Sequence, residues 1–267
     1  MKRKNGIISK IYMAIIMLFL YAPIATLIFF SFNDGKTTVW KGFTLEWYVE
    51  LFKDERIMSA LANTLIIAVL ASIFATILGT AGAIGINNLK GKKRLIIQNV
   101  SNIPIISPDI VMGVSLMLLF TTLGLIFNFE TGFATVLIAH ICFCVPFVVL
   151  NVMPRIKGMD KSIYDAALDL GCNQFQAFYK VVIHELMPGI ISGMLISFTY
   201  SLDDFIITYF TRGSRFQNLS IEIYSMTHKR VSPKINALSA LLFLAIIIIM
   251  VLINIRDRHE EKTKSRI

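Results

Sequence analysis

The sequence is poor in charge and in cysteine. Charged residues make up 16% of its 267 positions, against about 25% in an average soluble protein domain. Its three cysteines, Cys142, Cys144 and Cys172, form no CxxC pair. Its four histidines lie far apart, without the short spacing of metal ligands. The sequence therefore predicts neither a disulfide framework nor a metal site.

A nucleotide-binding loop is also absent. No segment of the chain fits the pattern GxxxxGK followed by Ser or Thr, whose backbone amides and lysine hold the phosphates of ATP. No nucleophile or group of metal ligands converges near the chain's carboxylates, as a hydrolytic site would require. We therefore predict that this chain is not an enzyme.

What the sequence has in abundance is long apolar runs. Hydrophobic residues make up 55% of the chain, and a helix needs about 20 apolar residues to cross about 30 Å of hydrocarbon. The run from Ile11 to Asn33 far exceeds the core of a signal peptide, so we predict a retained helix there. We predict an all-α integral membrane protein with six transmembrane helices: Ile11 to Phe32, Leu61 to Ile86, Leu95 to Phe120, Gly132 to Met153, Gly189 to Phe210 and Ile235 to Ile255.

The basic residues predict the orientation of these spans. With the N-terminus inside, the cytoplasmic side receives four Lys and Arg before the first span, four in residues 90–94, four in residues 155–180 and five after Ile255, so 17 of the 26. This bias agrees with the positive-inside rule, although the outer loop from Thr211 to Lys234 is also basic. We predict a multi-pass protein of the cell membrane with both termini cytoplasmic. The net charge of +9 then reflects topology and lipid contact, and predicts no nucleic-acid partner.

Three aspartates, Asp109, Asp203 and Asp204, lie inside the predicted spans. A carboxylate in hydrocarbon costs roughly 2.5 to 3.5 kcal/mol even on a lenient insertion scale. Counted from the predicted cytoplasmic ends, Asp109 and Asp203 both lie ~21 Å into the membrane at ~1.5 Å per residue. Such acids mark a cation path or a proton relay. A buried ion pair, or a protonated carboxyl bonded to a neighbouring span, is the alternative.

The third predicted span contains the segment NIPIISPD, which ends at Asp109. Pro104 and Pro108 each remove a backbone donor and disfavour helix at the preceding residue. We predict a break near Ser107, with Ser107 as N-cap, Pro108 as the first helical residue and Asp109 in the first turn. Broken helices often line transport paths. A proline kink packed against a neighbouring helix is the alternative.

The longest inner connection runs from Pro154 to Pro188 and has its own amphipathic pattern. Gly171 separates an apolar stripe from a second amphipathic stretch, and the stripe consists of Ile163, Ala166, Ala167 and Leu170. The pattern predicts a helix, a turn and a helix. Because an ordinary connection needs only a few residues, we expect another protein to dock here.

One segment of this loop, DAALDLG from Asp165 to Gly171, resembles the EAA motif of the transmembrane subunits of ABC importers. Other segments are similar to the permease subunits of spermidine/putrescine importers of this class: YAPIATLIFFSFN, SPDIVMGVSLMLLF, HICFCVPFVVL, SFTYSLDDF and IEIYSMTHKRVSPKINAL. The resemblance extends from about Ile11 to Ile255. The chain departs from the family in having Asp165 for the usual glutamate and His184 for a usual proline.

The resemblance implies the fold of a type-1 ABC importer permease, also called MetI-like. Residues 1–57 would form the N-terminal transmembrane helix and outer loop. Residues 58–255 would form the transmembrane domain of five helices with its coupling loop at 154–188, and residues 256–267 a basic cytoplasmic tail. Coupling to an ATPase is then assigned to Asp165, Ala166, Ala167, Leu168 and Gly171. The implied partners are a second related permease subunit, a dimeric ATPase that binds the ATP and Mg²⁺, and an extracellular polyamine-binding protein.

A polyamine suits carboxylates set among aromatic rings. We therefore assign the substrate path to Asp109, Asp203, Asp204, Tyr200 and Phe205. Adjacent residues on a helix point ~100° apart, so we expect one of Asp203 and Asp204 to face the path and the other a neighbouring helix or the partner permease. The alternatives are an importer of another solute, such as ferric iron, a phosphonate or an opine, and a proton-coupled secondary carrier.

Overall fold

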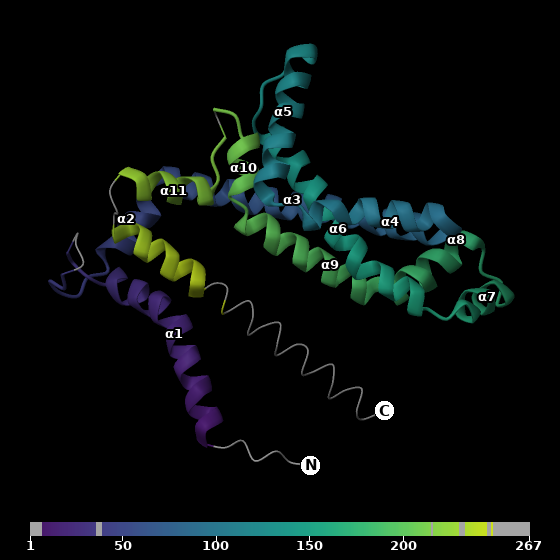
Figure 1. Ribbon diagram of the computed structural model, residues 1–267, viewed down its shortest axis with the longest axis horizontal. Helices are drawn as coiled ribbons and strands as arrows, with labels where there is room; N and C mark the ends of the chain where they lie inside the picture. The colour runs from purple at the N-terminus through teal and green to yellow at the C-terminus, as the bar shows by residue number, and fades with distance from the viewer. Residues whose placement is uncertain (1–6, 36–38, 215, 230–232, 245–246, 248–267) are drawn as a thin grey trace. The chain divides into compact units, whose positions relative to one another are not determined.

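The computed structural model describes residues 7–35, 39–214, 216–229, 233–244 and 247, and Figure 1 shows its helices. These residues form helices and loops, with one isolated antiparallel bridge between Asn33 and Phe43. The prediction of an all-α protein is confirmed. The chain divides into two compact units, residues 1–58 with 223–267, and residues 59–222.

Five helical segments are long and apolar enough to cross a membrane: Ser9–Ser31, Glu55–Asn88, Asp109–Phe127, Phe133–Gly158 and Gln174–Asp203. They belong to α1 (Ile7–Ser31), α3 (Glu55–Asn88), α5 (Asp109–Phe127), α6 (Phe133–Gly158) and the rod that ends with α9 (Ile183–Asp203). The sixth predicted span begins in a shorter apolar helix, Pro233–Leu244, and most of its remainder lies outside the described residues.

The smaller unit contains α1 and helix α2 (Glu46–Lys53), which lies in the predicted outer loop. Trp47 of α2 is buried and its indole N–H donates to the backbone oxygen of Asn33, at 2.8 Å. The ammonium group of Lys234 lies 3.0 Å from a carboxylate oxygen of Glu50, on the same helix. These contacts join α2 to the residues that follow α1 and to the segment that contains Lys234. α11 (Leu219–Lys229) precedes Lys234 in the chain.

In the larger unit, α6 packs against α9, α10 (Ile206–Thr211) and α4 (Gly91–Ile106). The segment GIISG of α9 brings the backbones of α6 and α9 close together, because Gly189 and Gly193 carry no side chain. A Cβ on Gly193 would lie 3.0 Å from the Cα of Val148, and one on Gly189 would lie 2.8 Å from the backbone oxygen of Asn151. Small residues at this spacing are the usual means of close helix packing in membranes.

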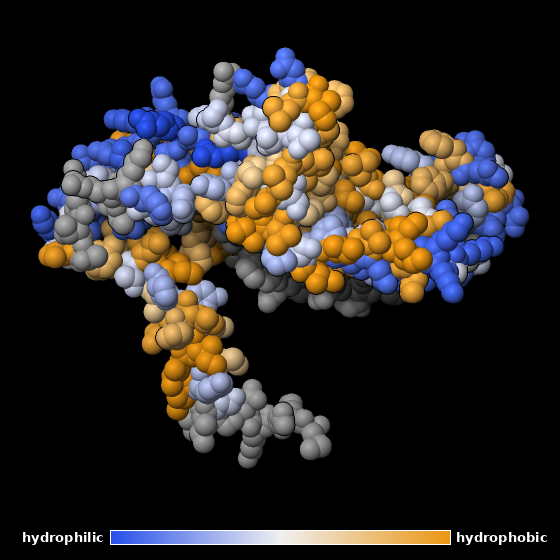
Figure 2. Space-filling model, turned by 45° about the horizontal axis from the view of Figure 1, so that its top comes forward, coloured by the Kyte–Doolittle hydropathy of each residue, from blue (hydrophilic) through white to orange (hydrophobic). Residues whose placement is uncertain are grey.

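The outward sides of these helices are apolar. Leu118, Leu125 and Ile126 of α5 expose 59%, 83% and 66% of their surface. In Figure 2 hydrophobic residues cover much of the helix sides, whereas hydrophilic residues gather at the end that carries α7 (Lys161–Asp169). Side chains of this kind are stable against hydrocarbon, which agrees with a membrane-spanning role for these helices.

The predicted break in the third span is confirmed, but its cap and bounds differ from the prediction. α4 ends at Ile106 and α5 begins at Asp109, so the apolar span is Asp109–Phe127 and not Leu95 to Phe120. Ser107 does not cap α5. Its backbone N–H and its hydroxyl both bond to the carbonyl oxygen of Ile103, at 3.0 and 2.9 Å. The serine thus closes the last turn of α4, and Pro108 takes the position before α5.

The fifth span also breaks, which the sequence did not predict. α9 ends at Asp203, Asp204 is extended with φ −65° and ψ 129°, and α10 begins at Ile206. A single helix from Gly189 to Phe210 is therefore wrong. The side chain of Asp204 accepts hydrogen bonds from backbone amides of α10 and so offers the chain an alternative to continuous helix. The ~100° rule for adjacent helical residues does not apply to this pair.

Candidate functional site

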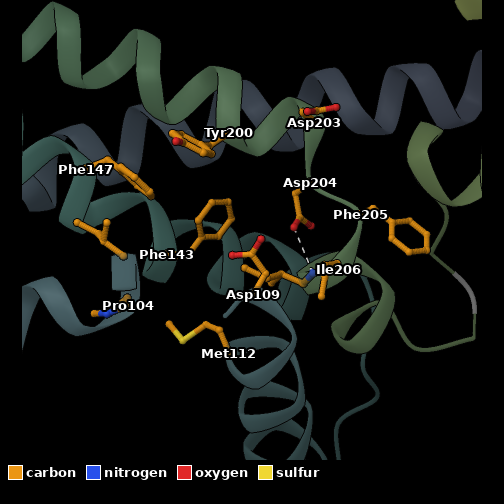
Figure 3. Close-up of a pocket in the computed structure, with 12 residues that line it drawn as sticks. Pro104, Asp109, Met112, Phe143, Phe147, Tyr200, Asp203, Asp204, Phe205 and Ile206 are labelled. Atoms are coloured by element: carbon orange, nitrogen blue, oxygen red, sulfur yellow. Dashed lines mark hydrogen bonds between the residues drawn. The ribbon is translucent and has the colours of Figure 1, made fainter. Parts of the chain in front are cut away.

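A cavity of about 410 Å³ lies where the two broken helices meet α6. All five residues predicted for the substrate path are on its wall, and Figure 3 shows them. The complete lining is Pro104, Ile105, Asp109, Met112, Phe143, Phe147, Tyr200, Asp203, Asp204, Phe205, Ile206 and Ile207. The structure thus brings together residues from distant parts of the sequence.

The two helix breaks place the carboxylates at this cavity. Asp109 is the first residue of α5 and Asp203 the last of α9, and both are exposed. In Figure 3 the side chains of Asp109 and Asp204 point toward the same space. Asp203 also lines the cavity, but in Figure 3 its side chain points to the side and not toward Asp109.

The carboxylate of Asp204 is already occupied. One oxygen accepts from the N–H of Ile207 at 3.1 Å, and the other accepts from the N–H and the hydroxyl of Thr208, each at 2.8 Å. The second oxygen also lies 3.4 Å from Nε2 of His140. The side chain is only 9% exposed. Asp204 therefore caps the start of α10, where the positive end of the helix dipole favours a carboxylate.

His140 is a site residue that the sequence reasoning missed. It is 1% exposed, in α6, and its ring joins three segments of the chain. Nδ1 lies 2.7 Å from the hydroxyl oxygen of Ser201 and Nε2 lies 2.9 Å from that of Thr208. His140 lacks the spacing of a metal ligand, so that pattern does not single it out. An ionisable residue inside an apolar span is itself a signal of function, and that signal could have found His140.

Aromatic rings line the cavity between the acids. Tyr200 of α9 stacks on Phe147 of α6 with ring centroids 4.4 Å apart and planes 19° apart, as Figure 3 shows. Phe143 and Phe205 complete the aromatic lining. Tyr200 and Phe205 were predicted, whereas Phe143 and Phe147 were not. Rings beside carboxylates can hold an organic ammonium ion by cation-π attraction as well as by charge.

The connection from Pro154 to Pro188 contains the helix, turn and helix that the sequence predicts. α7 begins after Asp160, whose carboxylate accepts from the N–H of Ser162 at 2.9 Å. This hydrogen bond lowers the pKa of Asp160. The helix ends at Asp169, and Gly171, two residues further on, has a φ of +89°. The amides of Gly171 and Cys172 close the turn by bonding to the oxygens of Leu168 and Ala167, at 2.9 and 3.1 Å.

The second helix of this connection continues into the fifth span. It consists of α8 (Gln174–Ala177), a π-helical turn η1 (Phe178–Val182) and α9, so that Gln174–Asp203 is one helical rod. Among the predicted coupling residues, Ala167 is buried, Leu168 is partly buried, and Asp165, Ala166 and Gly171 are exposed, and α7 packs against α8 and η1 of this rod. Leu170 is 87% exposed.

Comparison with known proteins identifies the family. Residues 75–259 match the model of the binding-protein-dependent transport system inner membrane component. The chain belongs to this family. It is 35% identical over 94% of its length to the spermidine/putrescine transport system permease protein PotC of Escherichia coli K12, of which 94% is covered. It is 37% identical over 85% of its length to the putrescine transport system permease protein PotI of the same strain, of which 83% is covered.

Solved structures agree with the fold. A bacterial ABC transporter that imports the acidic polysaccharide alginate matches 97% of this chain and 98% of its own, with a TM-score of 0.72 and 15% identity. The alginate transporter in complex with a periplasmic protein bound to an alginate pentasaccharide also matches. The match covers 94% of this chain and 93% of the transporter chain, with a TM-score of 0.66 and 17% identity. The all-α permease fold is therefore confirmed. Because it also carries an acidic polysaccharide, the fold alone does not decide the charge of the solute.

Proposed function

We propose that this chain is the transmembrane permease subunit of an ATP-driven importer of polyamines such as spermidine and putrescine. It forms half of the translocation path, and a second related permease subunit forms the other half. A dimeric ATPase binds ATP and Mg²⁺ on the cytoplasmic side, where both termini of this chain lie. An extracellular binding protein delivers the polyamine. Family membership supports the transport role, and the similarity to PotC and PotI supports the substrate.

The observation that carries the choice of substrate is the lining of the cavity. Asp109 and Asp203 present carboxylates, and the stacked rings of Tyr200 and Phe147 lie on the same wall. A polyamine is a chain of methylene groups that separates ammonium charges, so its charges suit the acids and its methylenes suit the rings. An anionic solute such as a phosphonate would meet acids at close range and be repelled.

The coupling role of α7 rests on its exposed surface and on the rod beside it. Asp165, Ala166 and Gly171 face outward and contact the ATPase, while Ala167 and Leu168 hold α7 against the rod. The rod Gln174–Asp203 spans roughly 45 Å at 1.5 Å per residue. It begins beside α7 and ends at the cavity. Movement of α7 by the ATPase therefore reaches Asp203 through one continuous element, which couples ATP hydrolysis to opening of the path.

Transport by the purified complex tests this proposal. The chain is expressed with its partner subunits, reconstituted in vesicles and supplied with ATP, labelled spermidine or putrescine, and the binding protein. We expect uptake that needs ATP and survives collapse of the proton gradient. Uptake that stops when the gradient is collapsed would instead identify a proton-coupled carrier. ATP hydrolysis stimulated by ferric iron, a phosphonate or an opine, and not by polyamines, would identify a different solute.

A further inference from the structure

The junction between α9 and α10 is held by a buried network of polar side chains. His140 of α6, Ser201 of α9 and Thr208 of α10 are 1%, 2% and 0% exposed. Asn218 joins them, with its side-chain amide 3.3 Å from both the hydroxyl oxygen of Thr208 and the backbone oxygen of Asp204. Buried polar groups of this kind cost free energy unless each is hydrogen-bonded, and here each has a partner.

The hydrogen bonds of this network run in one direction. Asn218 and Nε2–H of His140 donate to the hydroxyl oxygen of Thr208, and the hydroxyl hydrogen of Thr208 goes to the carboxylate of Asp204. Nδ1 of His140 then accepts from the hydroxyl of Ser201. This assignment uses each donor once and satisfies both ring nitrogens of a neutral imidazole. The sequence of donors ends on the carboxylate of Asp204.

The network fixes what the cavity offers to a ligand. With one oxygen bonded to the amide of Ile207 and the other to the amide and hydroxyl of Thr208, the carboxylate of Asp204 is occupied by protein donors although it borders the cavity. Asp109 and Asp203 remain exposed. Of the three carboxylates at the cavity, the two exposed ones are therefore left for direct contact with ammonium groups.

We propose that His140 is a positioning residue for the polyamine path, a role that rests on the proposed function. Through Thr208 and Asp204 it holds the start of α10 against the end of α9. This keeps Asp203 and Phe205 on the cavity wall and keeps the carboxylate of Asp204 bonded to protein donors. His140 itself is too deeply buried to touch the polyamine.

Two replacements of His140 separate its ring nitrogens. The amide of Gln reaches as far as Nε2 and can still donate to Thr208, whereas the amide of Asn reaches only as far as Nδ1 and can bond to Ser201 alone. Cys144→Ala is the matched control. Cys144 lies four residues further along α6, is equally buried and faces Ser197, away from the α9–α10 junction.

The experiment measures uptake by the complete complex in vesicles for the variants His140→Gln, His140→Asn and His140→Ala. We expect His140→Gln and Cys144→Ala to keep the KM for spermidine. His140→Asn and His140→Ala should raise it by about tenfold, as expected for the loss of one buried hydrogen bond next to a charge. Maximal ATP hydrolysis should change little, because α7 is untouched.

A double variant tests whether His140 acts through Asp204. In the background Asp204→Asn, the further change His140→Asn should raise the KM by less than twofold, since two members of one network are not additive. A KM change in the double variant that equals the product of the two single changes would overturn the proposal. A normal KM in His140→Asn would also overturn it, even if smaller and equal amounts of the His140→Asn and His140→Gln complexes assemble. A wild-type complex that transports no polyamine would instead refute the proposed function.

Discussion

Asp109 and Asp203 border one cavity from opposite ends of two helices, since Asp109 begins α5 and Asp203 ends α9. Each lies at the end of a helical segment that is long and apolar enough to cross a membrane, next to non-helical backbone. Non-helical backbone at membrane depth is stable only where protein or a water-filled cavity covers it. The two breaks and the cavity are therefore parts of a single arrangement that exposes carboxylates inside an apolar protein.

Removing either exposed carboxylate should weaken transport. We expect Asp109→Asn and Asp203→Asn each to raise the KM for spermidine uptake by about 10- to 100-fold, the range for losing one hydrogen bond to a charged group. The complex should still assemble, because both side chains are exposed. Uptake kinetics and co-purification of the subunits measure the two effects. Glu185→Gln is the control, since it removes an exposed carboxylate from the first turn of the same helix as Asp203. Wild-type KM in both aspartate variants would remove these residues from the path.

The ring of Tyr200 should contribute through its face and not through its hydroxyl. It stacks on Phe147 at the cavity wall, so Tyr200→Phe keeps the ring whereas Tyr200→Ala removes it. We expect Tyr200→Ala to raise the KM by about 2- to 30-fold, which corresponds to a cation-π contribution of about 0.5 to 2 kcal/mol. Tyr200→Phe should stay near the wild-type value. An equal loss in both variants would assign the effect to the hydroxyl group.

The sequence predicts one of the two breaks because its cause is local. Pro104 and Pro108 restrict their own backbone and that of their neighbours, so the end of α4 could be placed at Ser107 without knowledge of any contact. The turn at Gly171 is local in the same way, since glycine adopts a φ of +89° without the steric cost that other residues meet.

The break at Asp204 could not be predicted, because its cause lies elsewhere in the chain. The segment YSLDDFIITYF contains neither proline nor glycine. Asp204 ends the helix by bonding to the first amides of α10, and its support comes from His140, which contacts residues 61 and 68 positions away in the sequence. The sequence does identify which acids are expensive to bury. It does not show that one of them is satisfied within the protein.

The turn after α7 should be essential for coupling. Gly171→Pro cannot adopt a positive φ and loses the hydrogen bond from its amide to Leu168. We expect a complex that retains little spermidine-stimulated ATP hydrolysis, measured with the binding protein present. Gly171→Asn is the matched control, since asparagine tolerates this conformation better than other residues. Co-purification of a full complex with normal stimulated hydrolysis in Gly171→Pro would contradict the prediction.

Ala167 should affect coupling through the shape of the loop. It is 8% exposed and packs within the helix, turn and helix, whereas its neighbour Ala166 is exposed. Ala167→Leu should displace α7 from the rod. We therefore expect lower stimulated ATP hydrolysis and weaker protection of the α7 amides from hydrogen exchange. Ala166→Leu should lower hydrolysis by blocking the ATPase while leaving that protection unchanged. Lower protection in Ala166→Leu together with unchanged protection in Ala167→Leu would contradict this prediction.

The start of α7 should respond to pH through Asp160. Its hydrogen bond with the Ser162 amide lowers its pKa. Because the folded pKa lies below that of the unfolded chain, the cap contributes its full stability above the unfolded value and loses it as the pH falls through the folded one. We expect amide exchange in α7, corrected for the intrinsic pH dependence, to be slow at neutral pH and faster in acid. Asp160→Asn, which keeps a cap without a charge, should remove this pH dependence, and Asp160→Ala should give fast exchange at every pH. A wild-type profile that Asp160→Asn leaves unchanged would place the titrating group elsewhere.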